Sequence, residues 1–192
     1  MYNFFASMSR MKLIRRWSLM KAITDENIAE HSAQVAQIAH AIAVIAKKIY
    51  GKDVDPDRIT TLAIYHESSE VITGDLPTPI KYYNPDIRKA YKEIEHIANC
   101  KLLDMLPDEL REEYRPLVDQ PADCYEHEIV KAADKIAAYI KCVEELVNGN
   151  REFAKAKVTL LKDIKKFYHL PEVKYFCYSF LDSFSKTLDE LD

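Results

Sequence analysis

Apolar side chains recur at alternating spacings of three and four residues through most of the chain, which is the period of an amphipathic helix. No segment of useful length alternates apolar and polar residues as a half-buried strand would. The clearest apolar seam follows Asn27 and Glu30, which have the spacing of a capping box, and it closes at Gly51. The pattern predicts an all-α protein with a first long helix over roughly 28–50, whose seam contains Ile28, His31, Val35, Ile38, Ile42, Ile45 and Ile49.

Helix start signals divide the rest of the chain. Asp55 and Pro56 begin a second helix, which we expect to run to Gly74. The segment RPLVDQPADCYEHE contains two prolines and is predicted to be a connecting loop. The other predicted helices are a third long one that starts at Pro85, a short one restarted at Pro107, one from about 125 to Val147, one capped by Asn150 and a last one that begins near Pro171.

Composition narrows the classes of function. The net charge of -4 gives no general attraction to nucleic acid or to an anionic membrane, so neither is expected as a partner. The N-terminal segment lacks the apolar core of a secretory signal, and the most apolar run, 35–46, is too short to span a bilayer, so a cytoplasmic location is expected. The four cysteines form no CxxC pair, and three glycines leave no glycine-rich loop for phosphate. Any bound phosphate must therefore be held by side chains or by a metal.

Three polar residues occupy helix faces that are otherwise apolar: His31, His66 and Asp134. Each one alone is most simply a buried residue satisfied by a partner. Together, on three predicted helices, they could meet at one point, and His66 brings the carboxylates of Glu67 and Glu70 with it. Two imidazoles and two carboxylates would suit a divalent ion such as Mn, Fe, Co, Ni or Zn better than Ca or Mg.

The sequence around His66 also has a competing interpretation. His66, Glu67 and Glu70 form a near miss to the HExxH motif of zinc proteases, but the position four residues after His66 is a glutamate. No further histidine falls in the window where an extended protease motif would place one, so a metalloprotease is disfavoured. The remaining histidines are predicted to be structural or solvated: His40, His96, His127 and His169.

Four stretches of the chain resemble the bacterial HD-domain 5'-deoxynucleotidases, and they occur in the order and near the spacing of that family. They read SRMKLIRRWSLM, ENIAEHSAQVA, YHESSEVITGDLPTPIKYYN and KAADKIAAYIKCVEEL. The resemblance implies an HD-domain helical bundle in a single domain over 1–192, with the metal-site core at about 27–148 and C-terminal helices at about 150–190 packed on it. It also implies metal-dependent hydrolysis of deoxyribonucleoside 5'-monophosphates to deoxynucleosides and phosphate.

By this resemblance the metal ligands are a histidine, an adjacent His-Asp pair and a distant aspartate. These fall on His31, His66, position 67 and Asp134. Position 67 departs from the family pattern, because Glu67 stands where aspartate is expected and its carboxylate reaches one methylene further. The implied cofactor is one divalent transition metal ion: Mn, Co, Zn or Fe.

The resemblance further implies that Arg16 orients the substrate phosphate and that Trp17 lies against the sugar and favours deoxyribose. Without the resemblance, the simplest interpretation of Arg16 is a surface charge and that of Trp17 is a core aromatic residue. Residues Asp75 to Thr78 would then be a plain connecting loop stiffened by proline. The predicted substrate contacts are Arg16, Trp17, His31, Glu67, Asp75, Leu76, Pro77, Thr78 and Asp134.

Glu70, one predicted helical turn after His66, is a candidate for positioning or deprotonating the attacking water. It could instead support a ligand histidine. Two rival functions also stay open: hydrolysis of another nucleotide phosphate ester at the same site, and nucleotide binding without catalysis. A small nucleotide and a second copy of the chain, in a homodimer, are the expected partners.

Overall fold

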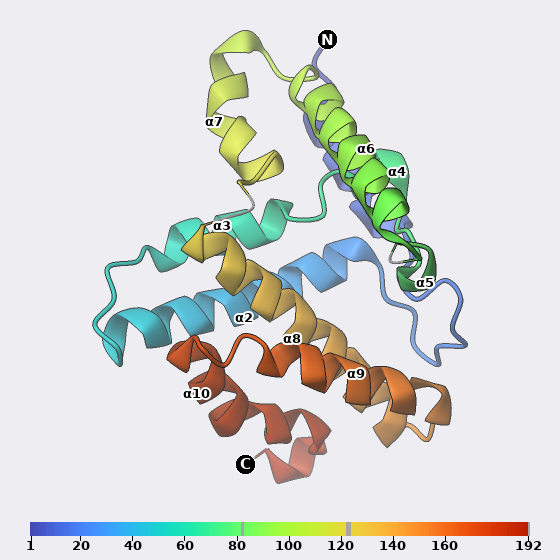
Figure 1. Ribbon diagram of the computed structural model, residues 1–192, viewed down its shortest axis with the longest axis vertical. Coiled ribbons are helices and arrows are strands. Elements are labelled where there is room, and N and C mark those ends of the chain that lie inside the picture. The colour runs from blue at the N-terminus through green and yellow to red at the C-terminus, as the bar shows by residue number, and fades with distance from the viewer. Residues whose placement is uncertain (82, 122–123, 192) are drawn as a thin grey trace.

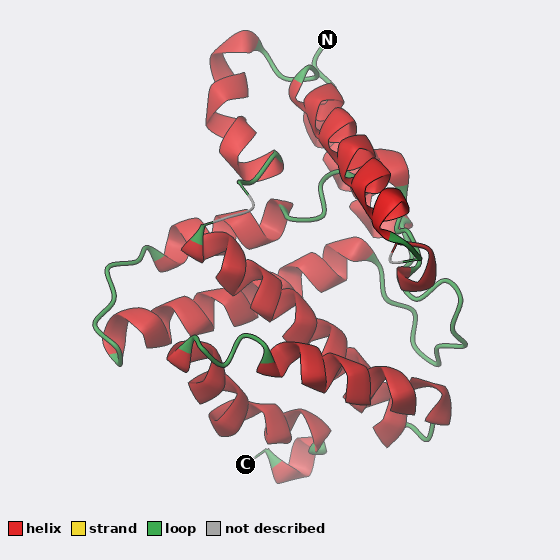
Figure 2. Cartoon of the chain, in the orientation of Figure 1, coloured by secondary structure: helices red, strands yellow, loops and turns green. Residues whose placement is uncertain are grey.

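The computed structural model describes residues 1–81, 83–121 and 124–191. Helices account for the regular secondary structure of these residues, so the predicted all-α class is confirmed (Figure 2). The α-helices are α1 (Phe4–Met8), α2 (Ile28–Lys48), α3 (Pro56–Tyr65), α4 (Glu70–Thr73), α5 (Thr78–Lys81), α6 (Pro85–Leu103), α7 (Asp108–Val118), α8 (Tyr125–Val147), α9 (Ala154–Lys165) and α10 (Pro171–Phe180). Short 3₁₀ turns are η1 (Ser9–Leu13), η2 (Arg151–Phe153), η3 (Leu181–Ser185) and η4 (Leu188–Glu190).

The start of α2 follows directly from its sequence. The Asn27 side chain accepts hydrogen bonds from the backbone amides of Ala29 and Glu30, each at 3.0 Å, and the Glu30 side chain accepts one from the Asn27 amide at 3.3 Å. This is the predicted capping box, and it satisfies amides that the first helical turn leaves without partners. Because α2 starts at Ile28, His31 lies in its first turn and points into the protein, where it is fully buried.

The main core forms where α2, α3 and α8 pack together, and α9 and α10 cover α8 and α2 (Figure 1). Ile42 of α2, Ile59 of α3 and Ile136 of α8 are completely buried. Burial of each such side chain contributes about 1.5–3 kcal/mol. Alanines on α2 and α8, such as Ala39 and Ala133, are buried too and allow the two backbones to approach closely. These three helices also carry the predicted metal ligands or lead directly into them.

A second apolar cluster joins the N-terminus to α6 and α7, which lie together at one end of the molecule (Figure 1). Its buried members are Phe4, Leu102, Leu103, Leu106 and Val118. Burial of Val118 explains one difference from the sequence prediction. Residues 115–118, expected to begin a loop, form the last turn of α7 instead, and the helix includes Pro116. The missing proline N–H removes only one helical hydrogen bond near the end, and the packing of Val118 offsets it.

The predicted end of the second helix, at Gly74, is wrong, because the helix breaks at His66. Helix α3 ends at Tyr65, residues 66–69 form a turn, and α4 begins at Glu70. Two side chains take carbonyl oxygens that a regular helix would use: His66 Nδ1 lies 2.7 Å from the Ala63 oxygen, and the Ser68 hydroxyl donates to the Tyr65 oxygen at 2.6 Å. The turn allows His66 and Glu67 to face the same side of the protein, whereas adjacent residues of a regular helix point about 100° apart.

The C-terminal aromatic face is divided between core and surface. Phe176 and Leu181 are buried in the main core, whereas Tyr178 and Phe180 are 74% and 45% exposed. Among the described residues, no helix combines the length and apolar character needed to cross a bilayer.

Candidate active site

Four side chains from three segments of the chain meet at one point. His31 comes from the first turn of α2, His66 and Glu67 from the turn after α3, and Asp134 from the middle of α8. Each offers one ligand atom, and these atoms all lie within 4.8 Å of one another. The structure thus brings together the four residues that the sequence predicts as metal ligands.

The His66 ring is held with one nitrogen turned toward this cluster. Because a carbonyl oxygen only accepts hydrogen bonds, His66 Nδ1 must donate to the Ala63 oxygen. In the neutral ring, Nε2 then carries no proton, and it is buried without a hydrogen-bond partner. The Glu67 carboxylate lies 3.5 Å from this nitrogen. A buried, unprotonated ring nitrogen beside a carboxylate is suited to bind a metal.

His31 and Asp134 are in direct contact, with 3.0 Å between His31 Nε2 and Asp134 Oδ1. Burial, reinforced by Arg16, lowers the pKa of His31 despite the opposing effect of Asp134, so the ring is neutral near pH 7. Burial alone would raise the pKa of Asp134, but Lys135 and His31 hold it well below its usual range. The pair therefore presents a neutral imidazole and an ionised carboxylate.

The longer side chain of Glu67 reaches the same cluster. Its Oε1 lies 3.5 Å from His66 Nε2 and 4.0 Å from an Arg16 guanidinium nitrogen. Burial opposes ionisation, but His66 and Arg16 contribute to lowering the pKa of Glu67 below its ordinary value. Two imidazoles and two carboxylates form a donor set that fits one divalent transition ion.

The chain preceding α2 brings Arg16 to this site. Residues 14–16 run antiparallel to residues 26–28: the Arg16 amide donates to the Glu26 carbonyl at 2.9 Å, and the Ile28 amide donates to the Ile14 carbonyl at 3.0 Å. The Arg16 guanidinium is 12% exposed. Burial opposes its charge, but Glu26, Asp134 and Glu67 raise the pKa of Arg16. A charged guanidinium therefore lies beside the predicted metal ligands.

Trp17 has an unusual backbone conformation. Its φ of 59° is the one positive value among the described residues other than glycine, and such a conformation costs of order 1–3 kcal/mol in a bulky residue. The indole Nε1 donates to the Glu26 carboxylate at 2.7 Å, and the ring meets the buried Phe153 edge to face at 5.3 Å between centroids. Trp17 is half-buried and is fixed by polar and aromatic contacts rather than by the apolar core.

The loop that follows Trp17 is anchored on the far end of α8. Glu145 accepts hydrogen bonds from the amides of Ile23 and Thr24, at 2.9 and 3.1 Å, and from Lys141 Nζ at 2.6 Å. Lys141 also donates to the Thr24 carbonyl at 2.6 Å, and the Asn150 side chain donates to Glu145 at 2.7 Å. Glu145 and Lys141 are 1% and 4% exposed, so this anchor is a buried charged network with its hydrogen bonds satisfied.

Glu145→Gln is expected to lower the free energy of unfolding at pH 7 by about 3 kcal/mol, because a neutral amide leaves Lys141 buried without its counter-charge. Burial would raise the pKa of Glu145, but the Ile23 amide, Lys141 and Asn150 lower it to about 2, from an ordinary 4.5. A depressed pKa in the folded state stabilises the protein above the unfolded value and loses that effect as the pH falls through the folded value. The contribution is thus complete above about pH 5 and disappears toward pH 2.

Urea titrations of wild type and Glu145→Gln at pH 7 and pH 3 measure this difference, which should shrink at the lower pH. The neighbouring Glu144 is exposed on α8, and Glu144→Gln is the matched control, expected to change stability by less than about 0.5 kcal/mol. Equal losses in the two variants, or a difference independent of pH, would contradict the role of Glu145.

Glu70 and the loop after α4 lie next to the cluster. Glu70 is 4% exposed, its Oε2 is buried without a hydrogen-bond partner, and burial together with Glu67 raises its pKa to about 11. Gly74, with φ of 72°, turns the chain into Asp75, which is half-buried and interacts electrostatically with Arg16. Beyond it, Leu76 and Pro77 are half-buried, and Thr78 is exposed as the first residue of α5.

Residues 3–184 match the family model described as 5'-deoxynucleotidase YfbR-like. The chain belongs to the YfbR-like 5'-deoxynucleotidase family. A Vibrio cholerae protein named 5'-deoxynucleotidase is 55% identical over 190 residues, which cover 98% of this chain and 97% of that protein. A 5'-deoxynucleotidase of Photorhabdus temperata is 52% identical over 192 residues, covering 100% of this chain and 97% of that protein. The family and the phosphoric monoester hydrolase class predicted from the sequence are confirmed.

Solved structures extend the likeness to the fold. An HD-domain phosphohydrolase from Listeria innocua superposes with a TM-score of 0.83 at 24% identity, over 95% of this chain and 88% of that one. The HD phosphohydrolase of cyanophage S-2L, described as bound to dA and one catalytic Zn²⁺ ion, has a TM-score of 0.69 at 19% identity, over 93% and 96% of the two chains. The predicted HD-domain helical bundle is confirmed by these likenesses.

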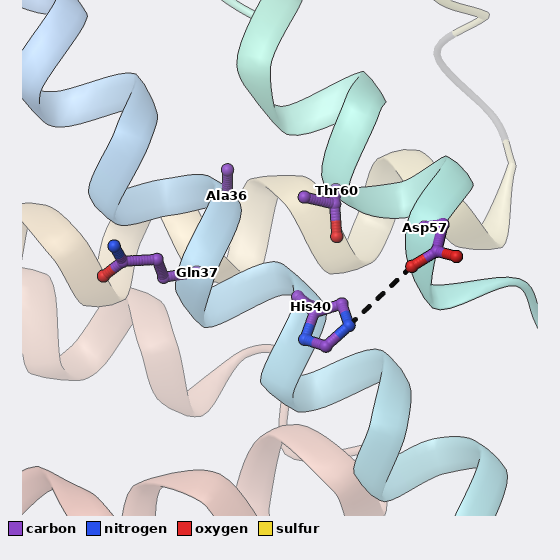
Figure 3. A pocket seen from close by; sticks show the side chains of 5 residues that line it. All are labelled: Ala36, Gln37, His40, Asp57 and Thr60. Atoms are coloured by element: carbon purple, nitrogen blue, oxygen red, sulfur yellow. Dashed lines mark ion pairs between the residues drawn. The ribbon is translucent and has the colours of Figure 1, made fainter.

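The other histidines of this YfbR-like deoxynucleotidase lie outside the cluster of four predicted ligands. Figure 3 shows His40 in a hollow between α2 and α3, with its Nε2 4.0 Å from an Asp57 oxygen. His40, nine residues after His31 on α2, projects from a different face of that helix, and none of the predicted ligands lines this hollow. His96 and His169 are exposed and pair with Asp119 and Glu128.

The sequence interpretation missed Glu26, Lys141 and Glu145. Glu26 looked like an ordinary polar residue before a helix cap, although it lies in one of the four family-like stretches. Lys141 and Glu145 are four residues apart on a seam that is otherwise apolar, and this spacing could have identified a buried ion pair. Their contact with the loop after Trp17 has no signal in local sequence.

Proposed function

We propose that this chain hydrolyses deoxyribonucleoside 5'-monophosphates to deoxynucleosides and phosphate, with one divalent ion (Mn, Co, Zn or Fe) held by His31, His66, Glu67 and Asp134. The observation that carries the proposal is the convergence of four ligand atoms within 4.8 Å, with Arg16 4.0 Å from one of them. The names of its full-length relatives support the choice of substrate.

Phosphate would bind between the ligand cluster and Arg16. A divalent ion, when bound, neutralises phosphate charge and activates water. Arg16 Nε is occupied by Glu26 at 3.0 Å, which leaves the two terminal amino groups of the guanidinium for phosphate oxygens. Two such donors can bind two phosphate oxygens at once and so orient the ester for in-line attack.

Glu70 is the residue that we assign to the attacking water. Its buried Oε2 receives no hydrogen bond from the protein. Burial and Glu67, to which Glu70 is hydrogen-bonded, raise the pKa of Glu70 to about 11, so Glu70 holds a proton at neutral pH and would position the water rather than deprotonate it. The alternative, that Glu70 supports a ligand histidine, is not favoured for His66, because His66 Nδ1 is already engaged by the Ala63 carbonyl. Substitution of Glu70 would then affect turnover more than nucleotide binding.

Trp17 would form the wall against which the sugar lies, and Asp75 to Thr78 would form the side of the pocket nearest Arg16. The fixed indole presents a flat apolar surface with no free polar atom, because its single N–H is engaged by Glu26. A 2'-hydroxyl pressed against this surface would lose its hydrogen bonds to water without replacement, which disfavours ribonucleotides.

A panel of nucleotides tests the reaction type. Purified protein with Mn or Co should release phosphate from deoxynucleoside 5'-monophosphates at least about tenfold faster than from the corresponding diphosphates, triphosphates and cyclic monophosphates, because one buried guanidinium is matched to a single phosphate group. Faster release from a cyclic or polyphosphorylated nucleotide would favour the rival phosphate ester. Nucleotide binding without release under any of these conditions would favour a non-catalytic module.

A homodimer is proposed as the assembly. The exposed aromatic side chains of Tyr178 and Phe180 near the C-terminus support it, because apolar surface of this kind is suited to a partner subunit.

A further inference from the structure

We propose that Glu26 is a positioning residue that sets sugar selection and phosphate binding by holding Trp17 and Arg16 in one arrangement. This inference rests on the proposed function, in which those two side chains contact the nucleotide. It adds a residue that neither the metal-ligand set nor the predicted substrate contacts include.

One carboxylate oxygen of Glu26 binds both side chains. Glu26 Oε2 accepts from Arg16 Nε at 3.0 Å and from Trp17 Nε1 at 2.7 Å. The side chain is 10% exposed, so little water competes for these bonds. Two neighbouring side chains with different proposed tasks, phosphate and sugar, are thereby fixed to a single point.

The other carboxylate oxygen faces the metal cluster. Glu26 Oε1 lies 3.9 Å from His31 Nδ1, the ring nitrogen opposite the one that contacts Asp134. That nitrogen has no hydrogen-bond partner in the structure, and the Glu26 carboxylate places a negative charge on the side of the ring away from Asp134. Glu26 therefore lies between His31 and the two side chains that are proposed to contact the nucleotide.

Trp17 needs such a restraint. Its positive φ gives the segment no regular backbone pattern that would fix the ring. The ring meets Phe153 edge to face, and the Arg16 guanidinium, which Glu26 also holds, lies 5.9 Å from the ring centroid. The hydrogen bond from the indole N–H to Glu26 fixes the rotation of the ring. Without it the indole can rotate about its side-chain bonds, and the wall facing the sugar loses its fixed position.

The role of the side chain is separable from that of the backbone. The Glu26 carbonyl accepts from the Arg16 amide at 2.9 Å, and residues Arg15 and Asn27 pair beside it, so the main-chain connection is retained whatever side chain stands at 26. Substitutions at this position therefore test the carboxylate alone.

Two substitutions that are similar in size to glutamate separate the hydrogen-bonding role of the Glu26 carboxylate from its charge. Glu26→Met removes both acceptor oxygens, and Glu26→Gln retains one acceptor that can occupy the place of Oε2 but removes the charge. Asp25→Ala is the matched control, because Asp25 is the adjacent carboxylate, is 69% exposed and pairs with Arg15 rather than Arg16. For each protein we would measure kcat and KM for dAMP and AMP with Mn, and the emission of Trp17 in metal-free protein. Since Trp17 is the single tryptophan of the chain, the emission reports on this site alone.

Glu26→Met should shift the Trp17 emission maximum and lower the dAMP-to-AMP ratio of kcat/KM by about tenfold, because the indole is no longer fixed. Glu26→Gln should keep the emission and the ratio near wild type but raise KM for both nucleotides about three- to tenfold, because a neutral acceptor holds Arg16 less strongly than a carboxylate. Asp25→Ala should match wild type in all three measurements.

Unchanged emission and sugar ratio in a folded Glu26→Met protein would overturn the proposal. If that variant does not fold, an unchanged KM in Glu26→Gln overturns it equally. Failure of the proposed function is a different result: the wild-type protein would release no phosphate, while the emission of Trp17 in the metal-free variants would still show whether Glu26 holds the indole.

Discussion

Asp134→Asn is expected to slow phosphate release from a deoxynucleoside 5'-monophosphate by about three orders of magnitude. A bound divalent ion contributes several kcal/mol of stabilisation to the charge of a phosphoryl transition state, and each 1.36 kcal/mol is a factor of ten in rate. Asp134 supplies one of two carboxylates in the cluster and lies 3.0 Å from His31. The amide keeps the shape of the side chain but removes the charge that holds the ion. Steady-state phosphate release and metal content after dialysis measure the two consequences together.

The control is a carboxylate of the same kind outside the site. Asp163 on α9 pairs with Lys166 at 2.6 Å near the surface, and Asp163→Asn should change neither metal content nor rate by more than about twofold. Full metal content and full turnover in Asp134→Asn would show that the four residues are not the metal ligands.

Arg16→Ala should lower kcat/KM for the same substrate by about a hundredfold or more. Its guanidinium is 12% exposed and is the charge beside Glu67 that can bind a phosphate dianion in two places. Loss of a preorganised donor at a developing charge costs about 10²–10³ in rate. The four proposed metal ligands remain, so metal content should stay near wild type while KM rises and kcat falls.

Arg15 is the matched control for this change, because it is the adjacent arginine, is 73% exposed and pairs with Asp25. Arg15→Ala should leave kcat/KM within about twofold of wild type. Similar losses in the two arginine variants would mean that the effect comes from net charge rather than from a phosphate site at Arg16.

The helices could be predicted where start signals and apolar seams agree. Asn27 and Glu30 fixed the beginning of α2, and α8 was predicted over the residues that it occupies, with its end at Val147. The break at His66 could not be predicted, because it depends on side chains that compete with backbone amides for the carbonyl oxygens of Ala63 and Tyr65. Periodicity detects the apolar face and is insensitive to this competition.

The convergence of His31, His66, Glu67 and Asp134 could be predicted because buried polar residues stand out in apolar seams and because the four family-like stretches agree with them. The hydrogen bonds that position Arg16 and Trp17 could not be predicted from the sequence. Glu145 and the amides that it binds at Ile23 and Thr24 are more than a hundred residues apart, and only the packing of α8 against the loop before α2 brings them together. The hydrogen bonds of Glu26 depend on a positive φ at Trp17 that its sequence does not signal.

The most direct measurement is phosphate release from dAMP and AMP by metal-free protein, before and after addition of Mn, Co, Zn or Mg. The account predicts no release without metal, release from dAMP once Mn, Co or Zn is added, and release from AMP at least about tenfold slower, since the cluster supplies two nitrogen and two oxygen ligands and Trp17 faces the sugar. Turnover that persists in metal-free protein, or equal rates for the two nucleotides, would contradict it.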